Sequence, residues 1–252
     1  MKSELVAIQN LLKVVHALRT KCPWDKKQTH KSLVRYLLEE AHEAAEAIQE
    51  GDFKNIKEEL GDVLLQVVLH SEIAQEKKKF SFEEVCNTIS EKMVRRHPHV
   101  FGGEKSPKNN SKRWSELKAK EKPERALLEG TPTSLPALIL AQRYGEIASS
   151  VGYDWTNTKS LISKVKEELF ELEVEIKKKK TKNAEMELGD LLFTITNLAR
   201  HLKIDSEAAL RKSSKKFKVR IEKVESKFKA KGKKLKDCTP EELDLAWQQV
   251  KK

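Results

Sequence analysis

The sequence has few of the residues that interrupt helices. It contains only 9 glycines and 7 prolines among 252 residues, and aromatic residues make up 6%. No clean two-residue alternation of apolar and polar residues competes with a helical period. Charged residues reach 35% and hydrophobic residues 38%, a balance typical of helical globular proteins. We therefore predict an all-α protein, with enough chain for two compact domains.

The sequence also lacks long apolar runs and paired cysteines. No stretch approaches the roughly 18 apolar residues of a transmembrane helix, and the first 20 residues have no apolar signal-peptide core. We expect no membrane partner and a cytoplasmic location. The cysteines Cys22, Cys86 and Cys238 are far apart and form no CxxC pair. We expect reduced, structural thiols rather than zinc ligands or disulfides.

The net charge of +11 raises the question of nucleic-acid binding. Most basic residues are interleaved with glutamate, as in IEKVESKFK at 221–229, which is typical of a solvated helix face. The one uninterrupted run, KKKK at 177–180, follows a glutamate-rich helix, where cations suit the helix dipole. Nucleic acid is therefore not the partner that we expect, although a binding module of that kind remains an alternative.

Apolar residues recur every three or four positions through most of the chain. Gly51-Asp52, Ser81 with Glu84, and the stretch 239–242 have the form of helix stops and caps. The predicted helices cover residues 4–19, 29–50, 53–78, 82–96 and 111–121 in the first half, and residues 135–150, 158–180, 183–203, 206–230 and 240–251 in the second.

One sequence motif occurs twice in the chain, as a tandem repeat. Glu39-Glu40-x-x-Glu43 matches Glu167-Glu168-x-x-Glu171, and nineteen residues after the second glutamate of each motif comes Glu59 or Glu187, followed by Leu-Gly-Asp. Farther along, Lys92, Arg96 and Trp114 match Lys216, Arg220 and Trp247. Three prolines and a glycine separate the copies. We predict an N-terminal domain at 1–122, a linker at 123–134 and a C-terminal domain at 135–252.

The repeated acids predict a metal site. Residues three apart on a helix share a face, so Glu40, Glu43, Glu59 and Asp62 are expected to converge between two antiparallel helices. Their counterparts are Glu168, Glu171, Glu187 and Asp190. Clustered carboxylates need cations, and oxygen ligands favour Mg²⁺ or Mn²⁺ over zinc.

Two interpretations of the acids compete with a magnesium site. Solvated glutamates paired with lysines are common. Against this, Gly61 and Gly189 interrupt strong helices at a cost of about 1 kcal/mol each, which suggests close backbone approach. A di-iron bundle would use Glu-x-x-His, which Glu39 and His42 provide, but Phe170 replaces that histidine in the second copy. We interpret His42 as incidental.

Cations and aromatic residues complete a polyphosphate site. Lys216 and Arg220 are four apart and share a helix face, as do Lys92 and Arg96. Such pairs suit the oxygens of a triphosphate. Trp247 and Trp114 offer flat surfaces to a nucleobase, although tryptophan at such a place is as often a core residue.

These motifs carry a family resemblance. EExxE followed by ExGD, the CPWD loop, RRHPHVF at 95–101, RWSELK, GYDW, ELGDLLF and the closing AWQQVKK together resemble the MazG-type nucleoside triphosphate pyrophosphohydrolases, from about residue 16 onward. That family belongs to the all-α NTP pyrophosphatase superfamily. The resemblance implies tandem helical bundles, homodimers, Mg²⁺, and cleavage of NTP or dNTP at the α-β bond to NMP and pyrophosphate with broad base tolerance.

The resemblance also implies roles for particular residues. In the C-terminal half, Glu168, Glu171, Glu187 and Asp190 would bind Mg²⁺. The nucleotide would contact Lys164, Glu168, Asn183, Glu185, Met186, Lys216, Arg220 and Trp247, although Ser213-Ser214 departs from the common pattern. Water would attack the α-phosphorus, with Glu167 orienting or deprotonating it and Lys216 and Arg220 stabilising the phosphates. We expect the C-terminal half to carry most activity; the alternative is a non-catalytic nucleotide-sensing or interaction protein.

Overall fold

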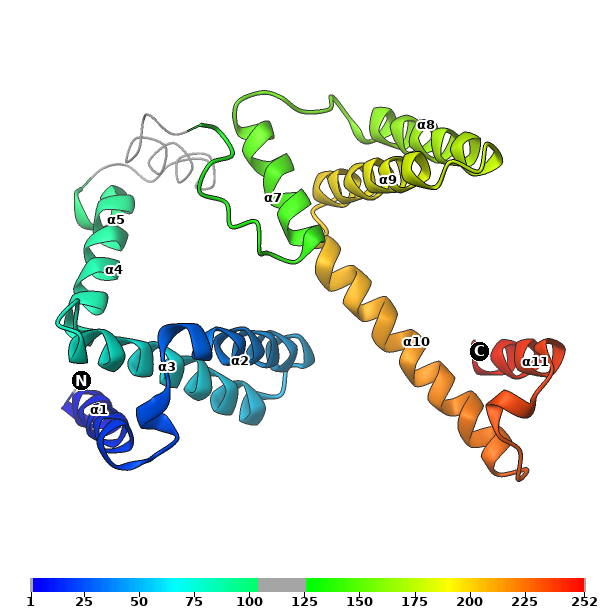
Figure 1. Ribbon diagram of the computed structural model, residues 1–252. Helices are drawn as coiled ribbons and strands as arrows, with labels where there is room; N and C mark the ends of the chain where they lie inside the picture. Colours follow the sequence, from blue (N-terminus) through cyan, green and yellow to red (C-terminus); the bar gives the residue numbers. More distant parts are fainter. Residues whose placement is uncertain (1, 104–125, 252) are drawn as a thin grey trace. The chain divides into compact units, whose positions relative to one another are not determined.

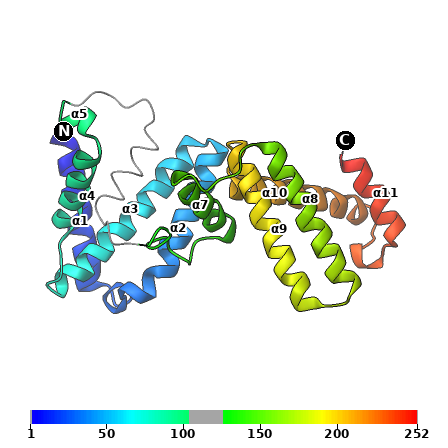
Figure 2. The same cartoon turned by 90° about the horizontal axis from the view of Figure 1, so that it is seen from above.

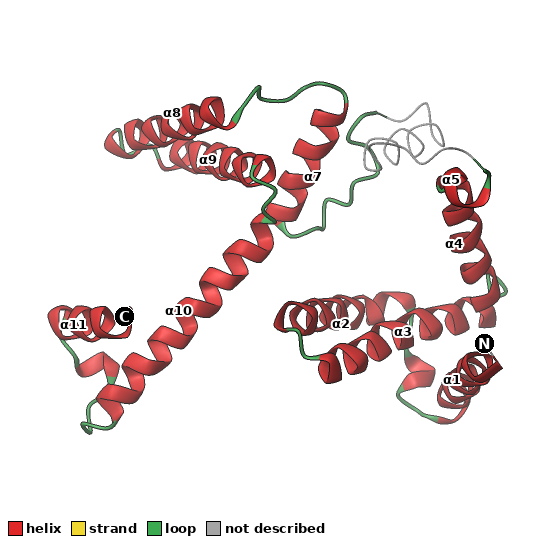
Figure 3. Cartoon of the chain, turned by 180° about the vertical axis from the view of Figure 1, so that it is seen from behind, coloured by secondary structure: helices red, strands yellow, loops and turns green. Residues whose placement is uncertain are grey.

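The structure is a computed structural model that describes residues 2–103 and 126–251 (Figure 1). These residues form helices joined by loops, with no strand among them (Figure 3), which confirms the all-α prediction. The chain divides into two compact units, Met1–Asn110 and Ser111–Lys252. Within the described ranges, no helix combines the length and hydropathy that crossing a bilayer requires.

Each unit is a series of helices. The elements of unit 1 are α1 (Lys2–Lys21), η1 (Asp25–Lys27), α2 (His30–Glu50), α3 (Phe53–Glu76), α4 (Phe82–Arg96) and α5 (Pro98–Phe101). The elements of unit 2 are α7 (Ala137–Ser150), α8 (Thr158–Lys177), α9 (Thr181–His201), α10 (Ser206–Lys229), η2 (Leu235–Asp237) and α11 (Pro240–Lys251).

The predicted helices agree with the observed ones to within a few residues. The predicted helix at 111–121 lies outside the described residues, and so does Trp114. The short α5 was not predicted, because a four-residue helix has no apolar period to detect. The predicted linker at 123–134 is described only from residue 126, and its boundaries stay a prediction.

A helical hairpin forms the centre of each unit. In unit 1, Gly51 ends α2 with a φ of 76°, a left-handed conformation that glycine adopts readily, and the Asp52 carboxylate caps α3 by accepting from the backbone N–H of Lys54 at 2.9 Å. The tight turn lays α3 antiparallel along α2 (Figure 2). In unit 2, α8 and α9 form the corresponding hairpin.

The core of unit 1 lies between α1, α2 and α3. Val15, Leu33, Val68, Leu69 and Ile73 are buried together. Beside them the Arg19 guanidinium donates to the Glu76 carboxylate at 2.6 and 2.8 Å. This bidentate pair fixes α1 against α3, so the core supports the hairpin from the α1 side.

Beyond its hairpin, the described part of unit 2 has packing contacts near both ends of α10. At the first, α7 lies against α9, where Gly145 faces the fully buried Asn197. At the second, α11 folds back on α10, and Val224, Phe228 and Ala246 are buried between them. Between these contacts α10 runs away from the α8–α9 hairpin (Figures 1 and 3).

The glycines of the two ELGD motifs correct one expectation. Close backbone approach was expected at Gly61 and Gly189, but a Cβ atom at either position would meet nothing within 4 Å. No described part of the chain packs there. The two glycines therefore leave open space on the helix face beside the repeated acids.

At Gly145, packing against a neighbouring helix requires the absence of a side chain. A Cβ there would lie 2.3 Å from Asn197 Oδ1, which also accepts from the Arg200 guanidinium at 3.2 and 3.3 Å. We expect Gly145→Ala to lower the free energy of unfolding by about 1 to 3 kcal/mol through overpacking. Gly189→Ala is the matched control and should instead add about 1 kcal/mol by its helix propensity. Thermal unfolding measures both, and equal stability of the two variants would contradict the packing assigned to Gly145.

Candidate metal centre

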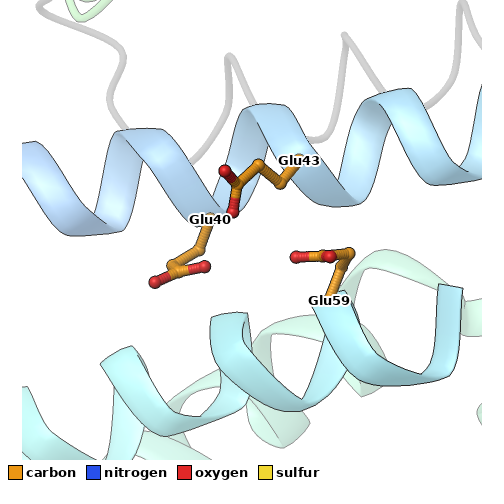
Figure 4. Close-up of side chains that lie close together, drawn as sticks. All are labelled: Glu40, Glu43 and Glu59. Atoms are coloured by element: carbon orange, nitrogen blue, oxygen red, sulfur yellow. The ribbon is translucent and has the colours of Figure 1, made fainter. Parts of the chain in front are cut away.

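Three glutamates of unit 1 face one another between α2 and α3. Glu40 and Glu43 project from α2 and Glu59 from α3 (Figure 4). One carboxylate oxygen of each lies within 4.8 Å of the others. The spacing of three residues along α2 places its two glutamates on one face, and the antiparallel turn brings Glu59 opposite them. The hairpin therefore builds a carboxylate triad.

Unit 2 builds the same triad from α8 and α9. Glu168 and Glu171 on α8 meet Glu187 on α9, again with an oxygen of each within 4.8 Å of the others. Glu168 is buried and Glu187 half-buried, whereas Glu171 is exposed. The predicted aspartates, Asp62 and Asp190, are not members of these triads, although their charges act on them.

Burial and repulsion between acids raise the pKa of the central carboxyl groups. Burial is the first cause for Glu40, Glu59 and Glu187. The second cause is a neighbouring acid: Asp62 raises the pKa of Glu40, Glu43 that of Glu59, and Glu171 that of Glu187. Each triad is thus a concentration of negative charge that a bound cation would relieve.

The donors of both triads fit a hard cation. All are carboxylate oxygens, the ligands that Mg²⁺ and Mn²⁺ prefer. His42 is exposed and belongs to neither triad, so the described residues provide no Glu-x-x-His ligand set of the di-iron kind.

The second triad has a cation of its own. Lys164 Nζ donates to Glu167 at 2.7 Å and lies 2.9 Å from Glu168. These contacts raise the pKa of Lys164, with Glu167 as the first cause. The aligned position in unit 1 is Tyr36, which bears no positive charge. Charge around the two triads is therefore not equivalent.

Glu175 also contacts the site, although the sequence motifs did not predict it. Its carboxylate is buried, accepts from Lys178 Nζ at 2.6 Å and from Asn183 Nδ2 at 2.8 Å, and helps to raise the pKa of Glu187. The signal was present, because Glu168, Glu171 and Glu175 are spaced by three and four residues on one helix face. Unit 1 has Ala47 at this position, so Glu175 is not among the residues that the two repeats share.

The predicted phosphate and base contacts lie on α10 and α11. The Arg220 guanidinium lies 5.9 Å from the ring centroid of Trp247, and the Phe217 ring lies 5.4 Å from it. No ion pair within the described chain joins Lys216 or Arg220 to Glu168, Glu171 or Glu187. The single chain therefore does not bring these cations to the carboxylates of unit 2.

The remaining predicted contacts are scattered. Met186 and Glu185 are exposed on the first turns of α9. In unit 1, Arg96 is buried and Lys92 half-buried, whereas their counterparts Arg220 and Lys216 are half-buried and exposed. The second cation pair is thus the more open to a ligand.

The carboxylate triads lie within the segments that a known family shares. A family model, the MazG nucleotide pyrophosphohydrolase domain, matches residues 28–101 and 156–225. The chain belongs to the MazG nucleotide pyrophosphohydrolase family. Both triads fall inside the matched segments, one in each, so the MazG domain occurs twice, as the repeat predicted. Trp247 lies beyond the second segment.

Relatives extend the match along the whole chain. The chain is 44% identical to "Nucleoside triphosphate pyrophosphohydrolase/pyrophosphatase MazG" of Thermotoga maritima, covering 100% of this chain and 98% of the relative. It is 40% identical to "Nucleoside triphosphate pyrophosphohydrolase" of Escherichia coli K12, covering 97% of each. A crystal structure of a mazG-related protein from Thermotoga maritima aligns with 44% of this chain and 97% of its own at 33% identity, with a TM-score of 0.39.

The raised pKa of Glu187 makes a prediction about stability. A carboxyl group whose pKa is raised by folding favours the folded state at low pH, and this contribution is lost as the pH rises through the raised pKa. Without divalent ions at neutral pH, Glu187→Gln should therefore unfold at a higher temperature than the native MazG chain. The difference should fade as the solution is acidified.

Mg²⁺ should reverse this order. At a concentration 100-fold above its Kd, the ion adds about 2.7 kcal/mol to the native chain, and Glu187→Gln should gain much less. Differential scanning calorimetry with and without Mg²⁺ tests both points. Glu173→Gln removes an equal charge from an exposed position outside the triad and serves as the control. An identical response of the two variants would contradict a metal site at the triad.

Proposed function

We propose that the protein is a Mg²⁺-dependent nucleoside triphosphate pyrophosphohydrolase that cleaves NTP and dNTP at the α-β bond, giving NMP and pyrophosphate with broad base tolerance. The observation that carries this proposal is the pair of carboxylate triads, built at matching positions of the two MazG domains. The names of the relatives from Thermotoga maritima and Escherichia coli support the same reaction.

The acids of each hairpin would hold the cation. In unit 2 these are Glu168, Glu171, Glu187 and Asp190, and in unit 1 they are Glu40, Glu43, Glu59 and Asp62. Bound there, Mg²⁺, or Mn²⁺ in its place, would neutralise phosphate charge and polarise the α-phosphoryl group. The open space that Gly189 leaves beside Glu187 and Asp190 gives a polyphosphate room to approach them.

The side chains around the acids would position the attacking water and bind the nucleotide. Glu167, whose carboxylate is 56% exposed, orients or deprotonates the attacking water. Lys164 Nζ lies 2.7 Å from the Glu167 carboxylate and so positions Glu167 beside Glu168. Lys216 and Arg220 stabilise the charge of the departing pyrophosphate. Lys164 and the start of α9, at Asn183, Glu185 and Met186, contact the nucleotide, and Trp247 stacks on its base.

A second copy of the chain would complete the site. Lys216 and Arg220 are on α10, which leaves the α8–α9 hairpin, so this pair of cations would reach the carboxylates from a second chain. The hairpin itself has large apolar side chains that are exposed in the single chain, including Phe170 at 63%, Leu188 at 46% and Leu192 at 47%. These exposed apolar side chains support a homodimer that would bury this face and share the site between two chains.

The two triads are not expected to contribute equally to turnover. Glu187→Gln should lower Mg²⁺-dependent pyrophosphate release from ATP by about 100-fold or more, since even outer partners of metal ligands are worth 10- to 100-fold. Glu59→Gln, the matched change in unit 1, should have a smaller effect, because the cation pair of unit 2 is the more open.

Product analysis of AMP and pyrophosphate measures this difference. Circular dichroism confirms that both variants are folded. A larger loss from Glu59→Gln would reverse the division of labour between the units. ATP that binds to the native chain without forming AMP would instead establish the non-catalytic, nucleotide-sensing alternative.

A site shared between copies predicts complementation. A chain carrying Glu187→Gln and a chain carrying Lys216→Ala with Arg220→Ala should each be inactive alone. Denatured together and refolded, they should regain roughly a quarter of native activity, because random pairing in a twofold dimer leaves one intact site in half of the dimers.

The control mixes Glu187→Gln with Glu171→Gln, which damage the same part of the site and should not complement each other. Light scattering reports the oligomeric state. Absence of recovery from correctly formed dimers would place both halves of the site in one chain.

A further inference from the structure

Almost all of the excess positive charge is concentrated in one part of the molecule. Residues 206–237, which include α10 and η2, contain thirteen lysines and arginines but only three glutamates and one aspartate. Their net charge is +9, out of +11 for the whole chain. The remainder of the protein is therefore nearly neutral, and α10 is its electrostatically distinct element.

The charges of α10 are sorted onto two sides of the helix. With 3.6 residues per turn, Lys212, Lys216, Arg220, Lys223 and Lys227 fall within a sector of about 80°. We call these five residues the basic ridge. The glutamates of α10 lie on the opposite side, where Glu207 pairs with Arg211 at 2.8 Å and Glu222 with Lys218 at 3.9 Å. One side is balanced and the other is entirely cationic.

The basic ridge has no acidic partner in the described chain. No ion pair joins any of its five residues to a carboxylate there. Four of the five are exposed, and Arg220 is half-buried. Neighbouring α11 offers them neutral groups, since Lys227 Nζ donates to Gln249 Oε1 at 3.1 Å and Arg220 faces Trp247.

A nucleoside triphosphate does not account for the basic ridge. Its five side chains extend over about 22 Å of helix, whereas three linked phosphates engage only the adjacent pair Lys216 and Arg220. The three outer residues are also absent from unit 1. Alignment of the two repeats places Thr88 and His99 opposite Lys212 and Lys223, and α4 ends at Arg96. The extra cations are therefore specific to unit 2.

We propose that the basic ridge binds the sugar-phosphate backbone of a single-stranded nucleic acid. A single row of cations matches a single strand of phosphates, since the glutamates leave no second row for the other strand of a duplex. The aromatic residues of α10, Phe217 and Phe228, fall outside the sector of the ridge at 3.6 residues per turn, and Trp247 of α11 lies against the ridge at Arg220. Phosphate contacts therefore dominate along the ridge, and recognition is independent of sequence. This inference does not rest on the proposed hydrolysis.

Salt dependence tests the proposal. The probe is a fluorescent, mixed-sequence single-stranded RNA with a 5′-hydroxyl end, so that it contains no triphosphate. Five phosphate contacts on a single strand give a slope of log K against log salt of roughly −3.5, or about 100-fold weaker binding at 200 than at 50 mM. The variant K212Q/K223Q/K227Q should bind more weakly at low salt and show a slope near about −1.4, or about 7-fold over the same range.

A matched variant separates the ridge from net charge. R211Q/K218Q/K229Q removes the same three charges from the opposite side of α10 and should keep the native slope. Equal losses in the two triple variants, absence of RNA binding by the native chain, or preference for duplex RNA or inorganic polyphosphate would overturn the proposal. So would dissociation of the dimer by K212Q/K223Q/K227Q, measured by light scattering, without a change in RNA affinity.

Pyrophosphate release from ATP, measured on the same proteins, keeps the two proposals distinct. Both triple variants should retain it, which also shows that they fold. Glu187→Gln should lose hydrolysis and still bind the RNA with the native slope. Parallel loss of both properties in Glu187→Gln would overturn the assignment of RNA to the ridge.

Discussion

Mutual repulsion among carboxylates is the constraint on which the two sites depend. Three glutamates from two helices have carboxylate oxygens within 4.8 Å of one another in each unit, and burial followed by the charges of neighbouring acids raises the pKa of Glu40, Glu59 and Glu187. In unit 1 the apolar core beside the hairpin and the capped turn hold the acids together against this repulsion. The fold thus maintains a concentration of negative charge at a cost in stability, as functional sites commonly do.

Much of this arrangement could be predicted from the sequence, because the spacing of apolar residues and the capping residues indicate where helices begin and end. The turn at Gly51-Asp52, the capping box of Ser81 and Glu84, and the facing of Glu59 toward Glu40 and Glu43 are all local consequences of spacing. Long-range packing was less accessible. Nothing in the ELGD motif tells whether its glycine touches another element, and the expectation of close approach at Gly189 was wrong.

The repeat predicted the residues that both units share, but not those that only one unit has. It identified Glu187 from Glu59, but it could not reveal features that only one copy has. Lys164, Glu175 and the basic ridge of α10 all belong to unit 2, and the first two change the charge at its triad. The copies therefore share a carboxylate triad and differ in the charged groups around it.

The short connection inside each hairpin determines which way the glutamate of the second helix faces. Glu59 follows Asp52 by less than two helical turns, and one residue inserted in that stretch would rotate Glu59 by about 100° about the axis of α3. In unit 2 the connection is closed by Lys179, whose φ of 56° reverses the chain before α9. The number of residues in these connections is consequently as much a determinant of the centre as the acids themselves, and insertions are tolerable only outside them.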